Sequence, residues 1–246
     1  MMDFAGSRLE IRYGVPAADQ ILYNRHFVIG YSYYFRQAKW ALEIVDPDVI
    51  DDDKTDAERA DNFRSDYRVP EMFRADLEVY KGSGYDRGHL VPSADQRDTD
   101  LQNSETFLLS NMSPQRPNFN RKIWKKLEDA IRQLDAPKKI YETYVISGPI
   151  FNFDVPILKM KSEDDDDVSL PIPHAYFKSV LTENNRGALH MWSFILPNEE
   201  SDKVLEEFLV PTVKLERYAG LFLWQRLVGR KIEREKGRIR RMWKYD

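Results

Sequence analysis

The chain has 246 residues, enough for one substantial domain, and 42% of them are hydrophobic, which favours a packed core over disorder. It contains no cysteine, so disulfides, zinc–thiolate sites and cysteine nucleophiles are excluded. Any metal must therefore bind oxygen ligands or the four histidines, and oxygen ligands suit Mg²⁺, Ca²⁺ or Mn²⁺.

The formal net charge is −4, which argues mildly against a nucleic-acid partner, but the charges are unevenly distributed. Acidic residues concentrate in Asp46–Asp53 and Glu163–Asp167, and basic residues in Arg116–Lys126 and after Gln225. Local patches decide where a phosphate backbone can bind. The sequence shows no signal peptide and no membrane-spanning run, so we expect a soluble cytoplasmic or organellar compartment and no membrane contact.

The first half of the chain predicts short strands separated by loops. β-branched and aromatic residues predict an opening pair of strands over 27–33 and 39–45. The acidic stretch 46–66 predicts a loop. A turn at Lys81–Gly84 leads into a strand over 85–91, and the short apolar run 106–109 predicts a further, buried strand.

A helix is predicted over Asn118–Leu134, with Asn118 or Asn120 as its N-cap. The apolar residues at helical spacing are Ile123, Trp124, Leu127, Ile131 and Leu134. Buried strands are predicted over 139–147, 175–181 and 189–196, and the last two are joined by a turn at Asn184–Gly187.

Short helices are predicted from Ser201 to Phe208 and from Pro211. The composition changes after Trp224, because residues 225–246 hold nine Lys or Arg against three acids. We predict a domain over 1–224 and a basic helical tail or linker over 225–246. The tail could bind nucleic acid, dimerise or dock, connect to another domain, or be a solvated amphipathic helix.

Asp86-Arg87-Gly88-His89 carries the first group of residues suited to catalysis. Phosphodiester hydrolysis needs a base for water and a counter-charge for the developing anion, and His89 and Arg87 suit these tasks. On an extended segment the two side chains share a face, and Gly88 permits close approach of backbone or substrate. The alternative is a turn with a structural histidine.

The second group lies on the predicted helix. Asn120, Trp124, Glu128 and Arg132 recur at four-residue steps and form a stripe on one side. Asn120 has an amide oxygen that can bind a hard cation, whereas Glu128 is about 12 Å of helix rise away and could instead bind the metal's waters. Arg132 could meet a phosphate or pair with Glu128. The alternative is an amphipathic helix with a cap and a surface ion pair.

Taken together and in this order, the motifs resemble those of the endonuclease G and bacterial nonspecific nuclease family, the ββα-metal class. The central motifs are Tyr85–Val91 (YDRGHLV), Leu109–Gln115 (LSNMSPQ) and Asn120–Glu128 (NRKIWKKLE). Further matches are YGVP at 13–16, WALE at 40–43, SGP at 147–149, PHAYFK at 173–178 and a stretch at 209–220. The similarity covers about residues 10–224.

The resemblance implies an α+β fold with a mainly antiparallel central sheet flanked by helices. It also implies that His89 deprotonates the attacking water and that Asn120 is the only protein ligand of Mg²⁺, for which Mn²⁺ could substitute. Glu128 would anchor the metal's waters, and Asn111 would help fix the site. Arg87 and Arg132 would stabilise the transition state. Asp86 would not bind the metal directly.

One position departs from the family pattern. Some members carry a phosphate-binding arginine where this chain has Ala38, and neither Arg36 nor Lys39 is a convincing substitute. The other histidines, His26, His174 and His190, have no carboxylate at metal-ligand spacing, and we assign them no role.

These observations predict a Mg²⁺-dependent, sugar-nonspecific endonuclease acting on DNA and RNA. The rival predictions are a sequence- or structure-selective nuclease on the same scaffold, and a catalytically silent or activator-dependent nucleic-acid-binding module. A homodimer is expected from the resemblance alone. Because such an activity endangers its own cell, we also expect an inhibitor protein, an activating assembly or sequestration.

Overall fold

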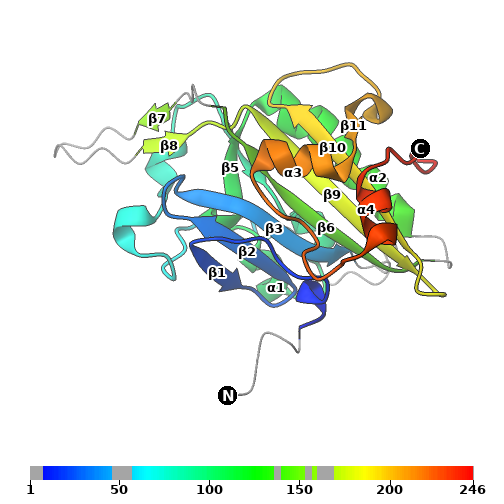
Figure 1. Ribbon diagram of the computed structural model, residues 1–246. Coiled ribbons are helices and arrows are strands. Elements are labelled where there is room, and N and C mark those ends of the chain that lie inside the picture. The colour runs from blue at the N-terminus through cyan, green and yellow to red at the C-terminus, as the bar shows by residue number, and fades with distance from the viewer. Residues whose placement is uncertain (1–7, 46–56, 136–139, 153–156, 160–168, 246) are drawn as a thin grey trace.

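The computed structural model describes residues 8–45, 57–135, 140–152, 157–159 and 169–245 (Figure 1). Its strands are β1 Gln20–Tyr23, β2 Phe27–Ser32, β3 Gln37–Val45, β4 Asp86–His89, β5 Met112–Gln115, β6 Ile140–Ile150, β7 Ile157–Lys159, β8 Ser169–Pro171, β9 Ala175–Asn184, β10 Leu189–Pro197 and β11 Leu209–Val210. Its α-helices are α1 Asp100–Glu105, α2 Lys125–Asp135, α3 Thr212–Ala219 and α4 Arg230–Lys236. Short 3-10 helices lie at Leu9–Ile11, Glu71–Phe73, Leu77–Tyr80, Ser93–Asp95, Leu109–Asn111 and Leu205–Phe208.

A large antiparallel sheet forms the centre of the molecule. In the described part of the chain it has seven strands in the order β1-β2-β3-β6-β9-β10-β11. Figure 1 shows α3 and α4 in front of this sheet and α2 behind it. The expected α+β fold, with a mainly antiparallel sheet flanked by helices, is confirmed. No helix among the described residues is long and apolar enough to cross a membrane.

Strand β9, inside the sheet, is buried on both faces, because the side chains that alternate along it pack against an apolar cluster on either side. Tyr176 and Val180 join the apolar cluster that contains the buried residues of α2. Phe177 and Leu181 join the opposite cluster, which contains Leu215 of α3. A strand covered on both sides becomes a nearly continuous apolar run, as the sequence indicated for this segment.

Most predicted strands of the sheet are confirmed, with ends that differ by a few residues. The runs 27–33, 39–45, 175–181 and 189–196 correspond to β2, β3, β9 and β10, and 139–147 corresponds to β6. Residue 139 and the acidic segments 46–53 and 163–167 lie outside the described residues. Residues 57–63 form neither helix nor strand, as expected for a loop.

A second unit consists of β4, β5 and the helix that follows them. The two strands pair antiparallel, so that Arg87 lies opposite Pro114 and His89 opposite Met112. The strand predicted over 85–91 is therefore present as β4. This pair and the helix form a strand–strand–helix unit, as the resemblance to the ββα-metal class implied.

The strand predicted over 106–109 is wrong. Leu108 makes only an isolated bridge with Arg64, and the chain then forms the 3-10 helix Leu109–Asn111. The buried amide of Asn111 explains the turn, since its nitrogen donates to the backbone oxygens of Thr106 and Val91. These side-chain bonds replace the partners that a neighbouring strand would supply.

The helix predicted over 118–134 is present, but a stretch near its start is π-helical. Phe119–Trp124 is π-helical and runs directly into α2. The predicted apolar residues are buried against the sheet. π-helical turns are rare and are found frequently at functional sites, and this one contains Asn120.

The C-terminal segment is helical over only part of its length. The helix predicted across 225–246 is limited to α4, and the residues after it cross to the α2 side of the sheet. Trp243 Nε1 donates to the carbonyl of Ala130 in α2, and Trp192 Nε1 of β10 donates to the carbonyl of Arg241. Packing against the sheet replaces helix continuation, since Met242 is buried in the α2 cluster.

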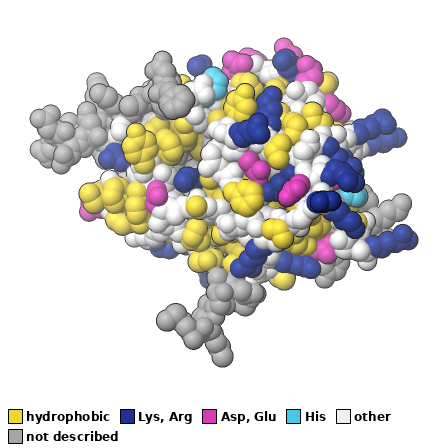
Figure 2. Space-filling view, in the orientation of Figure 1, with side chains coloured by type: hydrophobic (Ala, Val, Ile, Leu, Met, Phe, Trp, Pro, Cys, Tyr) yellow, Lys and Arg dark blue, Asp and Glu magenta, His cyan; other side chains and the backbone are white. Residues whose placement is uncertain are grey.

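Two shorter helices also differ from expectation. Residues 201–204 are not helical, and only the 3-10 helix Leu205–Phe208 forms. Pro211 is the N-cap of α3. Figure 2 shows Lys and Arg side chains gathered at the right of the view, where Figure 1 places α4.

We expect Trp243→Ala to lower the free energy of unfolding by about 3 kcal/mol, the lower end of the range for deleting a large aromatic side chain from a core. Its ring packs edge-on against Trp192 and Phe194 while its nitrogen bonds α2. Urea unfolding measures the change. The control is Ile239→Ala in the same segment, since Ile239 is exposed and its loss costs about 0.5 kcal/mol or less. Equal unfolding midpoints for the two variants would contradict the packing role.

Candidate active site

His89 ends β4 and lines a cavity of about 340 Å³. Its ring packs edge-on against Phe63 and Phe107, at centroid distances of 5.8 and 5.0 Å. Its Nε2 atom is buried and has no hydrogen-bond partner among the described residues. Burial, assisted by the positive charges of Arg59 and Arg87, lowers the pKa of His89 to about 3. The imidazole is therefore neutral at pH 7 and able to accept a proton.

Gly88 leaves room beside His89 for a side chain of β5. A Cβ atom at Gly88 would lie 2.0 Å from Oε1 of Gln115, the buried residue at the end of β5. Any side chain at this position would therefore have to displace the Gln115 side chain. The close approach predicted for this glycine is made by a side chain of the protein itself, and not by backbone or substrate.

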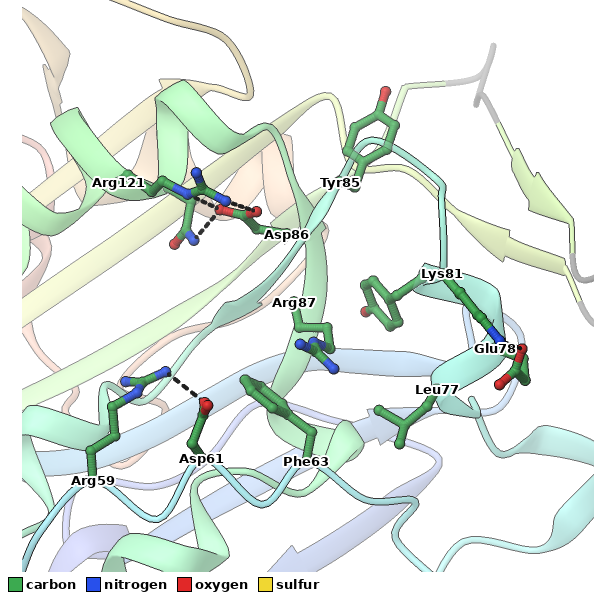
Figure 3. A pocket seen from close by; sticks show the side chains of 12 residues that line it. Arg59, Asp61, Phe63, Leu77, Glu78, Lys81, Tyr85, Asp86, Arg87 and Arg121 are labelled. Atoms are coloured by element: carbon green, nitrogen blue, oxygen red, sulfur yellow. Dashed lines mark hydrogen bonds and ion pairs between the residues drawn. The ribbon is translucent and has the colours of Figure 1, made fainter.

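Asn120 is oriented by Asp86 from the start of β4. The Asn120 Nδ2 atom donates to Oδ2 of Asp86 at 2.9 Å. Arg121 binds the same carboxylate through two nitrogens, at 2.9 and 2.7 Å, as the dashed lines in Figure 3 show. Since the amide nitrogen is engaged, the Asn120 carbonyl oxygen is left as the atom available to a cation. Asp86 thus contacts Asn120 while its own oxygens are paired with Arg121.

Glu128 projects from α2 and lines the same cavity as His89 and Asn120. Its Oε1 atom is buried and has no hydrogen-bond partner in the described part of the chain. Lys178 Nζ lies 3.9 Å from this oxygen. Burial raises the pKa of Glu128 to about 7, although the charge of Lys178 opposes the shift.

Arg132 also lines the cavity, but its guanidinium is already paired. It forms salt bridges with Asp95 and with Asp129 one turn earlier. The alternative prediction, an ion pair with Glu128, is wrong, because Asp95 occupies the guanidinium instead. Burial would lower the pKa of Arg132, but the adjacent Asp95 outweighs it and raises the pKa. A contact between Arg132 and phosphate stays a prediction.

Arg87 and Arg59 are exposed cations that line the site. The Arg87 guanidinium lies over the ring of Phe63 at 3.9 Å, and that of Arg59 over Phe107 at 4.8 Å. Both arginines line the cavity that holds His89 and an adjoining cavity of about 640 Å³ (Figure 3). Arg59 was not identified from the sequence. It supplies a cleft arginine in a chain that has buried Ala38 at the position expected to carry one.

Asn111 is fully buried and does not line either cavity. Its Oδ1 atom accepts from the Val91 nitrogen at 3.0 Å, and its Nδ2 atom donates to the Val91 oxygen at 2.9 Å. The Asn111 side chain therefore fixes the backbone two residues after His89. This geometry suits the positioning role that the resemblance implied.

The donor atoms around the cavity fit a hard divalent cation. The amide oxygen of Asn120 could bind the cation and the Glu128 carboxylate could bind its waters, since both residues line one cavity, which His89 also lines. No three His, Asp or Glu side chains cluster as a metal cage anywhere in the described ranges. A cation held here would therefore keep most of its water ligands, which Mg²⁺ commonly does.

Comparisons with known proteins place this chain among nucleases. The family model described as "DNA/RNA non-specific endonuclease" matches residues 5–228. Mitochondrial endonuclease G of Caenorhabditis elegans is 33% identical over 236 residues, which cover 92% of this chain and 75% of that protein. Nuclease C1 of Cunninghamella echinulata var. echinulata is 33% identical over 230 residues, covering 88% of each chain.

A solved structure shows the same fold. The crystal structure of an EndoG/EndoGI complex, which concerns the inhibition of EndoG, matches with a TM-score of 0.77 and 30% sequence identity. The match covers 89% of this chain and 91% of that chain.

Proposed function

The chain belongs to the DNA/RNA non-specific endonuclease family, and we propose from this premise that it is a Mg²⁺-dependent endonuclease that hydrolyses phosphodiester bonds of both DNA and RNA. One observation carries the proposal. His89, whose buried Nε2 atom has no hydrogen-bond partner among the described residues, lines the same cavity as Asn120, Glu128 and the exposed Arg87. Mn²⁺ is the expected substitute for Mg²⁺.

His89 is the general base of the proposed reaction. Its Nε2 atom accepts the proton of a water molecule whose oxygen forms a bond to phosphorus, while the bond from phosphorus to the leaving sugar oxygen breaks and that oxygen gains a proton from water. Asn120 would hold the metal through its amide oxygen, and Glu128 would bind its waters. A bound Mg²⁺ supplies positive charge against the phosphate and the leaving oxygen.

The exposed arginines account for the proposed indifference to base and sugar. Arg87 and Arg59 can bind phosphate oxygens, and contacts to phosphate position a nucleic acid without reading its sequence. Arg132, which is paired with two carboxylates, lines the same cavity as Glu128. Its positive charge is proposed to stabilise the negative charge that develops on the phosphate. Asn111 positions the backbone next to His89.

Partners and compartment are part of the same proposal. Because the related EndoG has been solved in a complex that concerns its inhibition, we propose that an inhibitor protein restrains this nuclease. An activating assembly and a homodimer stay predictions. Since the C. elegans relative is named mitochondrial, we favour an organellar compartment over the cytoplasm.

The test is digestion of supercoiled plasmid and of total RNA by the purified protein, with Mg²⁺ or with EDTA. We expect loss of both substrates with Mg²⁺ and of neither with EDTA. Cleavage confined to one sequence or structure would support the selective-nuclease rival. Binding of both nucleic acids without cleavage, by a folded protein supplied with Mg²⁺, would support the silent module.

The lowered pKa of His89 predicts activity at an unusually acidic pH. A base whose conjugate acid has a pKa of about 3 loses its function only as the pH falls through that value, well below the ordinary 6.5 of histidine. The pH profile of kcat/KM reports on groups of the free enzyme. Protonation of His89 should therefore cause no fall in kcat/KM near pH 6.5.

Glu128 must be separated from this measurement, because its pKa is raised to about 7 and its carboxylate loses charge as the pH falls through that range. In the Glu128→Gln variant only His89 of these two groups can still gain or lose a proton. We expect that variant to keep a flat kcat/KM from pH 7.5 to 5.5. A fall centred at pH 6.5 in the variant would show that His89 titrates normally and would contradict the prediction.

A further inference from the structure

Lys178 is a lysine buried in the middle of the central sheet. It lies on β9, only 1% exposed, between strands that are themselves covered on both faces. Alternation along β9 places Lys178 on the same face as Tyr176 and Val180, which is the face that α2 covers. Lysine is almost never fully buried unless it is paired, so the surroundings of this ammonium must compensate its charge.

The ammonium lies where β4 and the catalytic helix meet. Its Nζ atom donates to Ser147 Oγ at 2.8 Å and to the carbonyl oxygen of Leu90, the residue after His89, at 3.4 Å. It also lies 3.9 Å from Glu128 Oε1 and 4.6 Å from the centre of the Trp124 ring. Two of its three hydrogens are thus used by Ser147 and Leu90, and the third is available to Glu128.

Trp124 adds a second link at the same junction. Its indole Nε1 atom donates to the carbonyl oxygen of His89 at 3.2 Å, while its ring faces Lys178. Trp124 therefore binds the backbone oxygen of His89, and Lys178 binds that of Leu90. The position of the proposed base therefore depends on Trp124 and on Lys178, which also lies beside Glu128.

The buried charges around Lys178 contain more acids than bases. Glu43 on β3, Asp95 and Glu128 are carboxyl groups that are buried or nearly so, and Lys178 and Arg132 are the cations that lie among them. Asp95 pairs with Arg132, and Glu43 accepts a bond from Gln96 at 3.3 Å. Burial raises the pKa of Glu43 well above its ordinary range, which favours the neutral form of this carboxyl group. Glu128 is thus left with Lys178 as its closest counter-charge.

We propose that Lys178 is a positioning residue of the nuclease: its ammonium joins the end of β4 to α2 and holds the Glu128 carboxylate charged and directed into the cavity. This inference rests on the proposed function, because it assigns Glu128 to the metal's waters. Lys178 touches neither substrate nor metal and acts through Glu128 and the Leu90 carbonyl.

A double-mutant cycle between Lys178→Met and Glu128→Gln tests the proposal. Each variant is assayed for plasmid cleavage and, separately, for affinity toward Mn²⁺ alone, measured by electron paramagnetic resonance. We expect Lys178→Met in the otherwise unchanged chain to lower kcat and Mn²⁺ affinity by about 10- to 100-fold, as loss of a residue that supports a metal's environment does. In the Glu128→Gln background the same change should lower both by less than about 3-fold, because groups that act as one unit are strongly non-additive.

Equal losses in the two backgrounds would overturn the proposal, since Lys178 would then act independently of Glu128. Lys178→Gln is the second variant, used also if the methionine variant does not fold, because it keeps a hydrogen-bond donor and removes only the charge. Full activity and Mn²⁺ affinity in Lys178→Gln would also overturn the proposal. Losses similar to those expected for Lys178→Met would support it.

The matched control is Lys236→Met. Lys236 is also buried and pairs with a glutamate, Glu216, at 2.7 Å, but it belongs to α4 on the opposite side of the sheet. We expect this control to lose stability while keeping kcat and Mn²⁺ affinity. A wild-type chain that binds Mn²⁺ but cuts neither DNA nor RNA would count against the proposed function, whereas the Mn²⁺ cycle would still test Lys178.

Discussion

Replacing His89 with alanine is expected to lower the rate of plasmid and RNA cleavage by about 10²- to 10⁴-fold, the usual contribution of a positioned general base. The fold should remain intact, because the Nε2 atom of His89 makes no hydrogen bond among the described residues whose loss would leave a partner unsatisfied. Initial rates at saturating Mg²⁺ measure the effect, and Mn²⁺ binding measured separately should change little.

The control for His89→Ala is His174→Ala. His174 is an exposed histidine whose backbone is held by Ile150 and whose side chain lines neither cavity of the site. It should cleave at the wild-type rate. If His89→Ala kept more than about a tenth of the wild-type rate while remaining folded, another group would have to be the base, and the proposed mechanism would be wrong.

Much of the fold could be predicted because its signals are local. Strands such as β2 and β9 are covered by strands and helices, so their apolar and β-branched runs identify them without knowledge of their neighbours. The helix containing Asn120 shows its buried side as a 3.6-residue period. The Asp86–His89 motif lies on β4, which pairs with β5, and Gly88 leaves room for the Gln115 side chain of that strand.

The features that were missed depend on residues far apart in the sequence. Leu108 looked like part of a strand, but the chain turns there because the Asn111 amide bonds the backbone at Thr106 and Val91. Arg59 reaches the cleft from a loop whose path the sequence does not reveal. A lysine within the apolar run of β9 was the available signal for Lys178, since a charge in a doubly covered strand requires a buried partner.

The C-terminal segment shows the same limit. Its apolar residues have helical spacing, yet Trp243 binds α2 instead of extending α4. The spacing of Ile239 and Trp243 predicts a helix with one apolar side, but it does not show which surface of the protein that side packs against. Since Ile239 is exposed and Trp243 packs on the sheet, the two do not form one stripe.

Replacing Asn120 with alanine is expected to have the second large effect, through metal binding. Asn120 is the proposed protein ligand, with its amide nitrogen engaged by Asp86 and its oxygen left for the cation. Its loss should weaken Mn²⁺ binding by more than the 10- to 100-fold that removal of a supporting residue causes, so by roughly 100-fold or more. Cleavage should fall with it and should recover only partly when Mg²⁺ is raised.

Asn118→Ala is the matched control, because Asn118 precedes Asn120 by two residues but is exposed and donates to Glu200 at 2.8 Å. It should keep both Mn²⁺ affinity and activity, which separates loss of a ligand from disturbance of the π-helical turn. If Asn120→Ala instead bound Mn²⁺ as tightly as the wild type, the cation would have to be held elsewhere. Asp86 contacts Asn120, and Glu128 lines the same cavity. Of these two oxygen donors Glu128 would be the stronger candidate, since both oxygens of Asp86 are already paired with Arg121.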